Sequence, residues 1–107
     1  MENNTITIAV KTPNKQWCLL DVNNELSVFQ NIVQGPIELF YQSRSGILYF
    51  CNEEGKIFHL EPNFPFNRDI IVGTVFAVRS DDEGEFISLT FEDIKWFEHS
   101  MKGVPVL

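Results

Sequence analysis

The stretch IIVGTVFAV, residues 70–78, is a long apolar run in which β-branched residues recur. Near-continuous apolar character of this kind is typical of a central strand. Gly73 interrupts the run, and a glycine inside a strand often marks a bulge or the close approach of another segment. The stretch therefore predicts the centre of a sheet, and the other segments can be arranged around it.

A hairpin followed by a helix is predicted before this run. Apolar and polar residues alternate in TITIAV, residues 5–10, and PNK then makes a turn into QWCLLDV, residues 16–22. Asn23 and Asn24 can cap a helix whose apolar residues recur at helical spacing up to Gly35. The amino-terminal third of the chain is thus expected to form two antiparallel strands and one amphipathic helix.

Three short antiparallel strands are predicted in the middle of the chain. IELFYQ, residues 37–42, and GILYFCN, residues 46–52, flank a short turn, and EEG then turns the chain into KIFHL, residues 56–60. The proline-rich segment 61–69 that follows is expected to be a loop.

A short strand and a helix are predicted to close the chain. FISL, residues 86–89, suits a strand, and Thr90 can cap a helix with Asp93 in the reciprocal capping position. The spacing of this helix predicts a core-facing stripe of Phe91, Ile94, Phe97 and Met101.

The predicted fold class is α+β, a mainly antiparallel sheet of five to seven strands with two amphipathic helices packed on it. At 107 residues, the chain 1–107 is expected to be a single domain with a single core. Hydrophobic residues make up 44% of the sequence, which indicates a folded chain rather than a disordered one.

The charge balance narrows the choice of partner. Fifteen acidic residues outnumber eight basic ones and leave a formal charge of -7. Direct binding to nucleic acid is disfavoured, because phosphate neutralisation needs clustered lysine and arginine. A protein with a basic surface is the expected partner, since charge complementarity raises encounter rates. No secretory leader or membrane span is recognisable, which predicts a cytoplasmic protein without a membrane partner.

Four blocks of sequence resemble a known family. They are LSVFQNIVQGPIEL (26–39), CNEEGK (51–56), DIIVGTVFAV (69–78) and ISLT (87–90). Taken in this order, the blocks resemble those of the domain-of-unknown-function family DUF3846. The resemblance implies a small accessory protein of bacteria, phages or plasmids, and it carries over no catalytic residue. The chain departs from the family pattern at Gln34-Gly35-Pro36 and, in the closing helix, at Phe91 and Trp96. The closing helix is thus marked as the place where this member has specialised.

Metal binding is one candidate activity. Cys18, Cys51, His59 and His99 are the possible ligands, but no C-x-x-C or H-x-x-x-H pair is present. Buried, reduced cysteines and ordinary histidines explain these residues better than a zinc site does. The acidic run 81–85 lacks the ligand spacing of a calcium loop and is expected to be a solvated turn.

Enzymatic activity is not predicted. The sequence has no G-x-S-x-G elbow and no glycine-rich loop before a helix, so neither nucleophilic catalysis nor phosphate binding is indicated.

The closing helix and the acidic run before it form the candidate binding face. At helical spacing Trp96 lies on the side opposite the predicted core stripe, together with Glu92 and His99. Trp96 is expected either to lie under the carboxy-terminal VPVL or to be an exposed anchor in an acidic surface. Residues 81–98 contain seven acids and one lysine, and so hold six of the seven net negative charges. The predicted protein-binding residues are Asp81, Asp82, Glu83, Glu85, Glu92, Trp96 and His99.

These features predict a non-enzymatic, acidic protein-binding module of a phage or other mobile element. It would inhibit a host protein that handles nucleic acid, such as a defence nuclease or CRISPR effector, by occluding a basic surface. In function it would be an anti-CRISPR or anti-restriction protein. A small zinc-binding protein using Cys and His ligands, and a structural or dimerising accessory domain, remain as alternatives.

Overall fold

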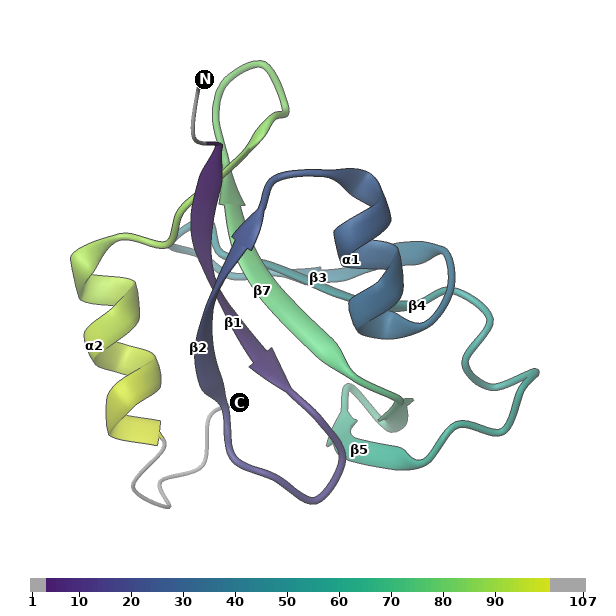
Figure 1. The fold of residues 1–107 in the computed structure, drawn as a ribbon. Helices are drawn as coiled ribbons and strands as arrows, with labels where there is room; N and C mark the ends of the chain where they lie inside the picture. Colours follow the sequence, from purple (N-terminus) through teal and green to yellow (C-terminus); the bar gives the residue numbers. More distant parts are fainter. Residues whose placement is uncertain (1–3, 101–107) are drawn as a thin grey trace.

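A twisted antiparallel sheet organises the molecule in the computed structural model, which describes residues 4–100 (Figure 1). Its strands run in the order β2-β1-β7-β4-β3, and β8 also pairs with β7. Their bounds are β1 Thr5–Lys11, β2 Cys18–Asn23, β3 Ile37–Gln42, β4 Leu48–Asn52, β7 Val75–Ser80 and β8 Phe86–Ile87. The helices are α1, Leu26–Val33, and α2, Phe91–Ser100. The predicted α+β class, with a mainly antiparallel sheet and two helices, is confirmed.

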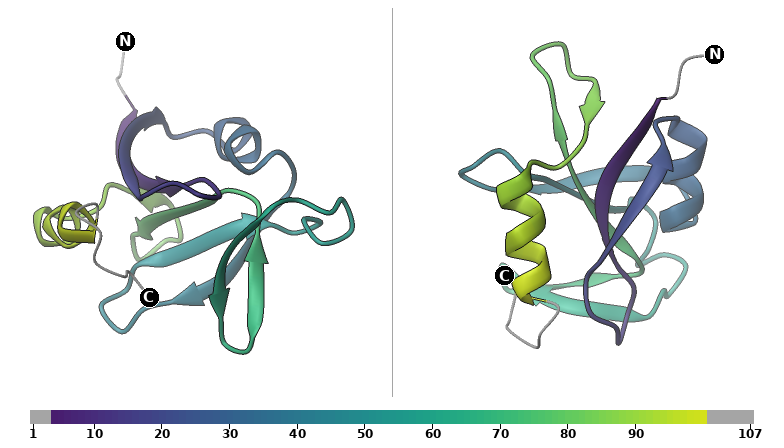
Figure 2. Two further views of the ribbon diagram at one scale, coloured as in Figure 1. Left: turned by 90° about the horizontal axis from the view of Figure 1, so that it is seen from below. Right: turned by 60° about the vertical axis from the view of Figure 1, so that its left-hand side comes forward.

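The central strand β7 is buried on both faces, as its apolar sequence predicts. Phe76 and Val78 belong to an apolar cluster on the side of α1, whereas Val75 and Ala77 belong to a second cluster on the side of α2. The two helices lie on opposite sides of the sheet (Figure 2). The expectation of a single core is therefore wrong, because the sheet separates two apolar clusters.

The run 70–78 is divided between two strands rather than forming one. Strand β6, Asp69–Val72, ends just before Gly73, which adopts a φ of 77°, and β7 begins at Val75. A Cβ atom at Gly73 would lie 2.8 Å from Leu60 Cδ1, so a second segment does approach closely here. The predicted close approach is confirmed, and the chain changes direction at the same residue.

Two predictions for residues 53–69 are wrong. The expected strand 56–60 is a series of turns, in which Leu60 N donates to Gly55 O at 3.0 Å. The expected loop contains a strand, β5, Pro62–Phe66, which pairs with β6 in a separate two-stranded sheet. Prolines are tolerated in β5 because a two-stranded sheet consists of edge strands. Phe64 of β5 packs against the apolar cluster on the α2 side. The strand is therefore held by a tertiary contact that the local sequence does not reveal.

The amino-terminal cap predicted for α1 is also wrong. Glu25 occupies the N-cap position without a side-chain hydrogen bond, and Asn24 Nδ2 donates instead to Phe86 O at 2.8 Å. The helix ends as predicted before Gly35, where buried Asn52 donates to Val33 O and Gln34 O, each at 3.1 Å. Asn52 thus satisfies carbonyl groups that a helix end leaves without intrahelical partners.

Helix α2 begins as predicted, and its predicted core-facing stripe is confirmed at Ile94 and Phe97 but not at Phe91. Thr90 and Asp93 form the expected reciprocal cap, with Asp93 N 3.1 Å from Thr90 Oγ1 and Thr90 N 2.8 Å from Asp93 Oδ2. Phe97 is fully buried and Ile94 packs beside it, but Phe91 is 68% exposed and does not belong to the core. Met101 lies outside the described residues. The carboxylate of Asp93 is also buried, which the apolar pattern did not predict.

Candidate functional site

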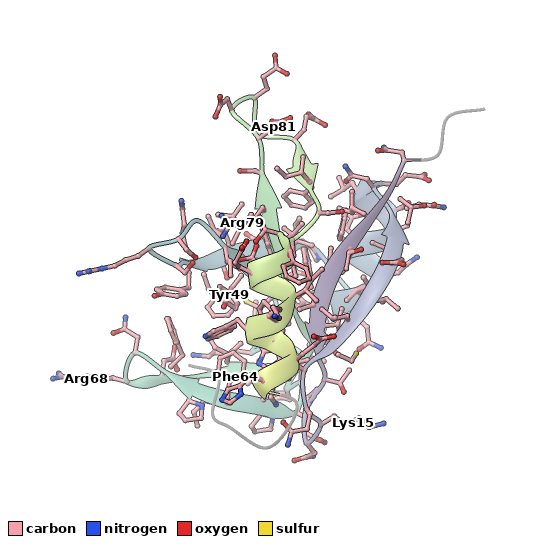
Figure 3. All side chains as sticks on the ribbon, turned by 90° about the vertical axis from the view of Figure 1, so that its left-hand side faces the viewer. Lys15, Tyr49, Phe64, Arg68, Arg79 and Asp81 are labelled. Carbon is pink, nitrogen blue, oxygen red and sulfur yellow. The ribbon has the colours of Figure 1, made fainter. Side chains whose placement is uncertain are left out.

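Arg79 joins three segments at one side of the sheet. Its guanidinium donates to Asp93 through Nε, at 2.5 Å, and through Nη2, at 2.9 Å. Its Nη1 donates to Ser45 O at 2.6 Å, in the turn between β3 and β4. The end of β7, the start of α2 and the β3–β4 turn are therefore held together by one side chain, which lies beside α2 in Figure 3.

The pairing with Arg79 sets the ionisation of Asp93. Burial by itself raises the pKa of a carboxyl group, but hydrogen bonds from Arg79 and Thr90 outweigh it and hold the pKa of Asp93 below its usual value. The hydrogen bonds to Asp93 in turn raise the pKa of Arg79 against the opposing effect of its burial. Asp93 is thus a charged structural group whose negative charge is already neutralised.

A groove of about 580 Å³ lies beside this junction, between α2 and the β3–β4 hairpin. Its strand-side wall is aromatic, because the ring centroid of Tyr41 lies 4.9 Å from that of Phe66 and 5.6 Å from that of Tyr49. We call it the α2 groove, and its lining residues are Tyr41, Ser43, Arg44, Ser45, Ile47, Tyr49, Phe66, Glu92, Asp93 and Trp96.

The structure brings two of the predicted binding residues together in the α2 groove. Trp96 is 42% exposed, and its ring stands edge-on to that of Phe97, with centroids 4.9 Å apart. Glu92 lines the groove with it, whereas His99 is exposed on α2 and is not part of the lining. The expected alternative, in which VPVL covers Trp96, concerns residues 104–107, which lie outside the described residues.

The other predicted acids form a separate structure, the turn of residues 81–85 between β7 and β8, which we call the acidic turn. Asp81 Oδ1 accepts hydrogen bonds from the backbone N–H groups of Glu83 and Glu85, each at 2.9 Å, and Gly84 adopts a φ of 85°. Asp82, Glu83 and Glu85 are exposed. Figure 3 shows Asp81 where the β7–β8 hairpin projects beyond the body of the sheet, beyond Arg79 and Tyr49. The predicted turn is confirmed.

Several residues of the α2 groove were not predicted. Tyr41 and Tyr49 come from strands whose apolar pattern indicated only packing, Phe66 comes from the segment predicted to be a loop, and Arg44 comes from a turn. Burial, together with the charges of Tyr41 and Asp93, raises the pKa of Tyr49, so its hydroxyl stays protonated at neutral pH. No local sequence signal places these residues beside Trp96, because Tyr41, Arg44 and Tyr49 approach α2 through the pairing of β3, β4 and β7, and Phe66 through the separate β5–β6 sheet.

The four candidate metal ligands lie on different elements. Cys18 is exposed on β2, which contradicts its predicted burial, whereas Cys51 is buried on β4, and both thiols are free. Burial and the nearby charge of Glu38 raise the pKa of Cys51 to about 11, against the smaller opposing effect of Lys56. His59 lies in the turns after β4 and His99 on α2. Within residues 4–100 no group of three or more His, Cys, Asp or Glu side chains is placed to hold a metal ion.

A second exposed surface is apolar. Ile57 and Ile70 line a smaller groove of about 250 Å³, and Phe58, next to Ile57, is 65% exposed. Lys56 and Asp69 form an ion pair within the same lining.

Comparison with known proteins identifies a family. The sequence profile of the Domain of unknown function (DUF3846) matches residues 6–102. No curated protein and no solved structure matches the chain. In the part of the chain that the structure describes, no helix has both the length and the apolar character needed to cross a membrane.

Proposed function

This chain belongs to the DUF3846 family, and we propose that this member is a non-enzymatic, acidic protein-binding module of a phage or other mobile element. In this proposal it acts in the host cytoplasm and inhibits a protein that handles nucleic acid, such as a defence nuclease of the CRISPR or restriction type. It does so by covering a basic surface. The observation that carries the proposal is that an exposed acidic turn and a groove lined by a half-exposed tryptophan occur in one small domain.

Charge supplies the first part of the argument. Residues 81–98 hold six of the seven net negative charges of the chain. Figure 3 shows Asp81 at one end of the molecule and the cations Lys15 and Arg68 toward the other. A surface of one sign attracts a lysine- and arginine-rich surface and accelerates its association.

Aromatic side chains supply the second part. Trp96 and Tyr41 are 42% and 37% exposed, and both line the α2 groove. Tryptophan and tyrosine are enriched among the few interface residues that provide most of the binding free energy. The α2 groove would therefore provide the desolvated contact of the complex, while the acidic turn would provide steering.

Rigidity supplies the third part. Asp81 fixes the acidic turn through bonds to Glu83 N and Glu85 N, and Arg79, directly before Ser80, anchors the base of the hairpin to α2 and the β3–β4 turn. A surface held in one conformation before binding loses less entropy when it binds.

Affinity capture tests the proposal. The tagged protein is incubated with extract of a bacterial host, and captured nucleases are identified and assayed for activity with and without the protein. Two variants are compared with the parent: Trp96→Ala, and a fourfold variant with Asp81→Asn, Asp82→Asn, Glu83→Gln and Glu85→Gln. Both are expected to reduce capture and inhibition, and capture by the parent should weaken at high salt.

Phe58→Ser is the matched control, because it removes an exposed aromatic side chain outside both the α2 groove and the acidic turn. Capture and inhibition that persist in both test variants, or that fall only in the Phe58→Ser protein, would refute the proposal.

A second candidate function is favoured by the apolar surface at Ile57, Phe58 and Ile70, each of which is exposed. Exposed apolar patches mark association surfaces, so the chain could instead be a dimerising accessory domain. This candidate predicts a dimer by light scattering that Ile57→Ser and Phe58→Ser together convert to a monomer. A parent protein that is monomeric at all concentrations would exclude it.

A further inference from the structure

We infer that the α2 groove is a socket for an arginine side chain of the basic partner. The inference rests on the proposed function, since it names the group of the partner that this surface would recognise. It depends on three features of the groove, namely its aromatic walls, its remaining carboxylate and the fixed position of α2.

Aromatic rings line the α2 groove from both of its sides. Tyr41, Tyr49 and Phe66 come from the strands, with the rings of Tyr41 and Phe66 inclined at 61°. Trp96 comes from α2, where its ring is inclined at 86° to that of Phe97. Ring faces attract cations, and the planar guanidinium group stacks on them with a smaller loss of hydration than an ammonium group.

Of the two carboxylates that line the α2 groove, one is available to pair with a bound cation. Asp93 lines the groove, but Arg79 and Thr90 already occupy its oxygens. Glu92 also lines it and forms no ion pair with another residue of the range 4–100. An arginine in the groove could therefore stack on the rings and donate hydrogen bonds to Glu92, a pairing stronger than that of neutral groups.

Arg44 is the one cation in the lining of the α2 groove. The effect of its removal, stronger or weaker binding, therefore tests whether the ligand is a cation. Like charges repel, so Arg44 opposes the entry of an arginine, and its removal should strengthen binding. A nucleotide would show the reverse, because its phosphate would pair with Arg44 while its base stacked on the rings. The net charge of -7 and the carboxylate of Glu92 favour the cation.

The relation between α2 and the strands is set by Arg79, which bonds to both Asp93 and Ser45 O. The two walls of the groove thus hold their spacing before any ligand enters, and a preorganised site loses less entropy on binding.

A peptide titration tests the inference on the full chain. The probe is the blocked tripeptide acetyl-Gly-Arg-Gly-amide, and its control carries citrulline, which has nearly the same shape without the charge. Binding is followed by amide chemical shifts, which report the site, and by tryptophan fluorescence. Of the two tryptophans, Trp17 is buried and Trp96 is half-exposed. The arginine peptide should shift the residues of the α2 groove saturably, with an affinity at least about tenfold above that of the citrulline peptide, as expected for a charge-assisted bond.

Variants separate the contributions. Glu92→Gln should weaken the arginine peptide about tenfold, while Glu98→Gln, on the same helix but outside the lining, should change little. Trp96→Phe should retain binding in the chemical-shift assay and Trp96→Ala should lose it. Arg44→Gln should strengthen it. Each variant is first shown to be folded by the dispersion of its amide spectrum.

Equal binding of both peptides, equal effects of Glu92→Gln and Glu98→Gln, or weaker arginine binding in the Arg44→Gln protein would overturn the inference. So would saturable binding of adenosine monophosphate that Arg44→Gln abolishes. If the peptide result is negative while the fourfold acidic-turn variant still abolishes capture, the socket is wrong and the proposed function stands. If capture is also unchanged, both are wrong.

Discussion

Asp93 shows how one buried charge can serve both a helix and a site. It is 5% exposed, caps the start of α2 through Thr90 and pairs with Arg79 through both of its oxygens. Its negative charge stabilises the position of α2 and is not available to a ligand, so the neighbouring Glu92 is the more suitable binding carboxylate. At the scale of single residues, burial thus decides which of two adjacent acids is structural.

The first prediction concerns the pH dependence of this carboxylate. Because the folded-state pKa of Asp93 lies below its unfolded value of 3.8, its stabilising effect is complete above that pH and is lost as the pH falls through the folded pKa. Asp93→Asn should lower the free energy of unfolding at pH 7 by about 2 to 4 kcal/mol, since it leaves Arg79 without its partner. Urea unfolding of both proteins at pH 7 and pH 3 measures this. If Asp93→Asn lowers the free energy of unfolding by the same amount at pH 7 and at pH 3, the charge of Asp93 is not responsible for the loss.

The second prediction concerns the thiols. Burial raises the pKa of Cys51 to about 11, which disfavours its reactive thiolate at neutral pH, whereas Cys18 is exposed on β2. An aromatic disulfide reagent at pH 8 should therefore titrate one thiol quickly in the folded protein and the second only on unfolding. In the Cys18→Ser variant the fast phase should vanish. Its persistence there would mean that Cys51 is accessible.

At the scale of elements, α2 shows why periodicity alone placed Ile94 and Phe97 correctly but Phe91 wrongly. Phe97 faces the core as predicted, with its ring centroid 4.9 Å from that of Trp17, and Asp93 on the same helix reaches Arg79. Phe91 is instead exposed, and the Lys95 ammonium nitrogen lies over its ring, 5.1 Å from the ring centroid. A reciprocal cap depends on residues three apart and was predictable, whereas the orientation of the helix depends on residues of other strands.

The third prediction uses this difference between the two phenylalanines. Phe97→Ala should lower the free energy of unfolding by about 3 to 5 kcal/mol, because it leaves a cavity beside Trp17 and Tyr49. Phe91→Ala should cost less than about 1 kcal/mol, as is usual for exposed positions. Equilibrium denaturation of the two variants compares them directly. Equal losses would restore Phe91 to the core and contradict the observed face of α2.

At the scale of the whole molecule, the acidic turn lies apart from the two apolar clusters of the core. The sheet buries one apolar cluster on each face, while the acidic turn projects from its edge and Arg68 lies far from it in Figure 3. Like charges held close together destabilise a compact state through repulsion. The acids of the turn are thus expected to contribute more to binding than to stability.

The fourth prediction follows for the fourfold acidic-turn variant. Its thermal midpoint at low salt should equal or exceed that of the parent, because it removes repulsion while an asparagine at position 81 can still accept the bonds from Glu83 N and Glu85 N. The difference should shrink as salt is added. Thermal unfolding at two salt concentrations measures both effects. A large loss of stability would instead assign the acids a structural role.

The sequence by itself determined what depends on near neighbours or on composition: the hairpin of alternating residues 5–10, the Thr90–Asp93 cap, the buried run ending at Val78, the acidic turn and the net charge. Its likeness to DUF3846 rests on that same linear order. Tertiary structure alone decided that a proline-bearing segment forms β5, that Phe91 is exposed, and that Tyr41, Phe66 and Trp96 line one groove. These outcomes depend on contacts between segments far apart in the chain, where the burial of one side chain is settled by which others reach the same space.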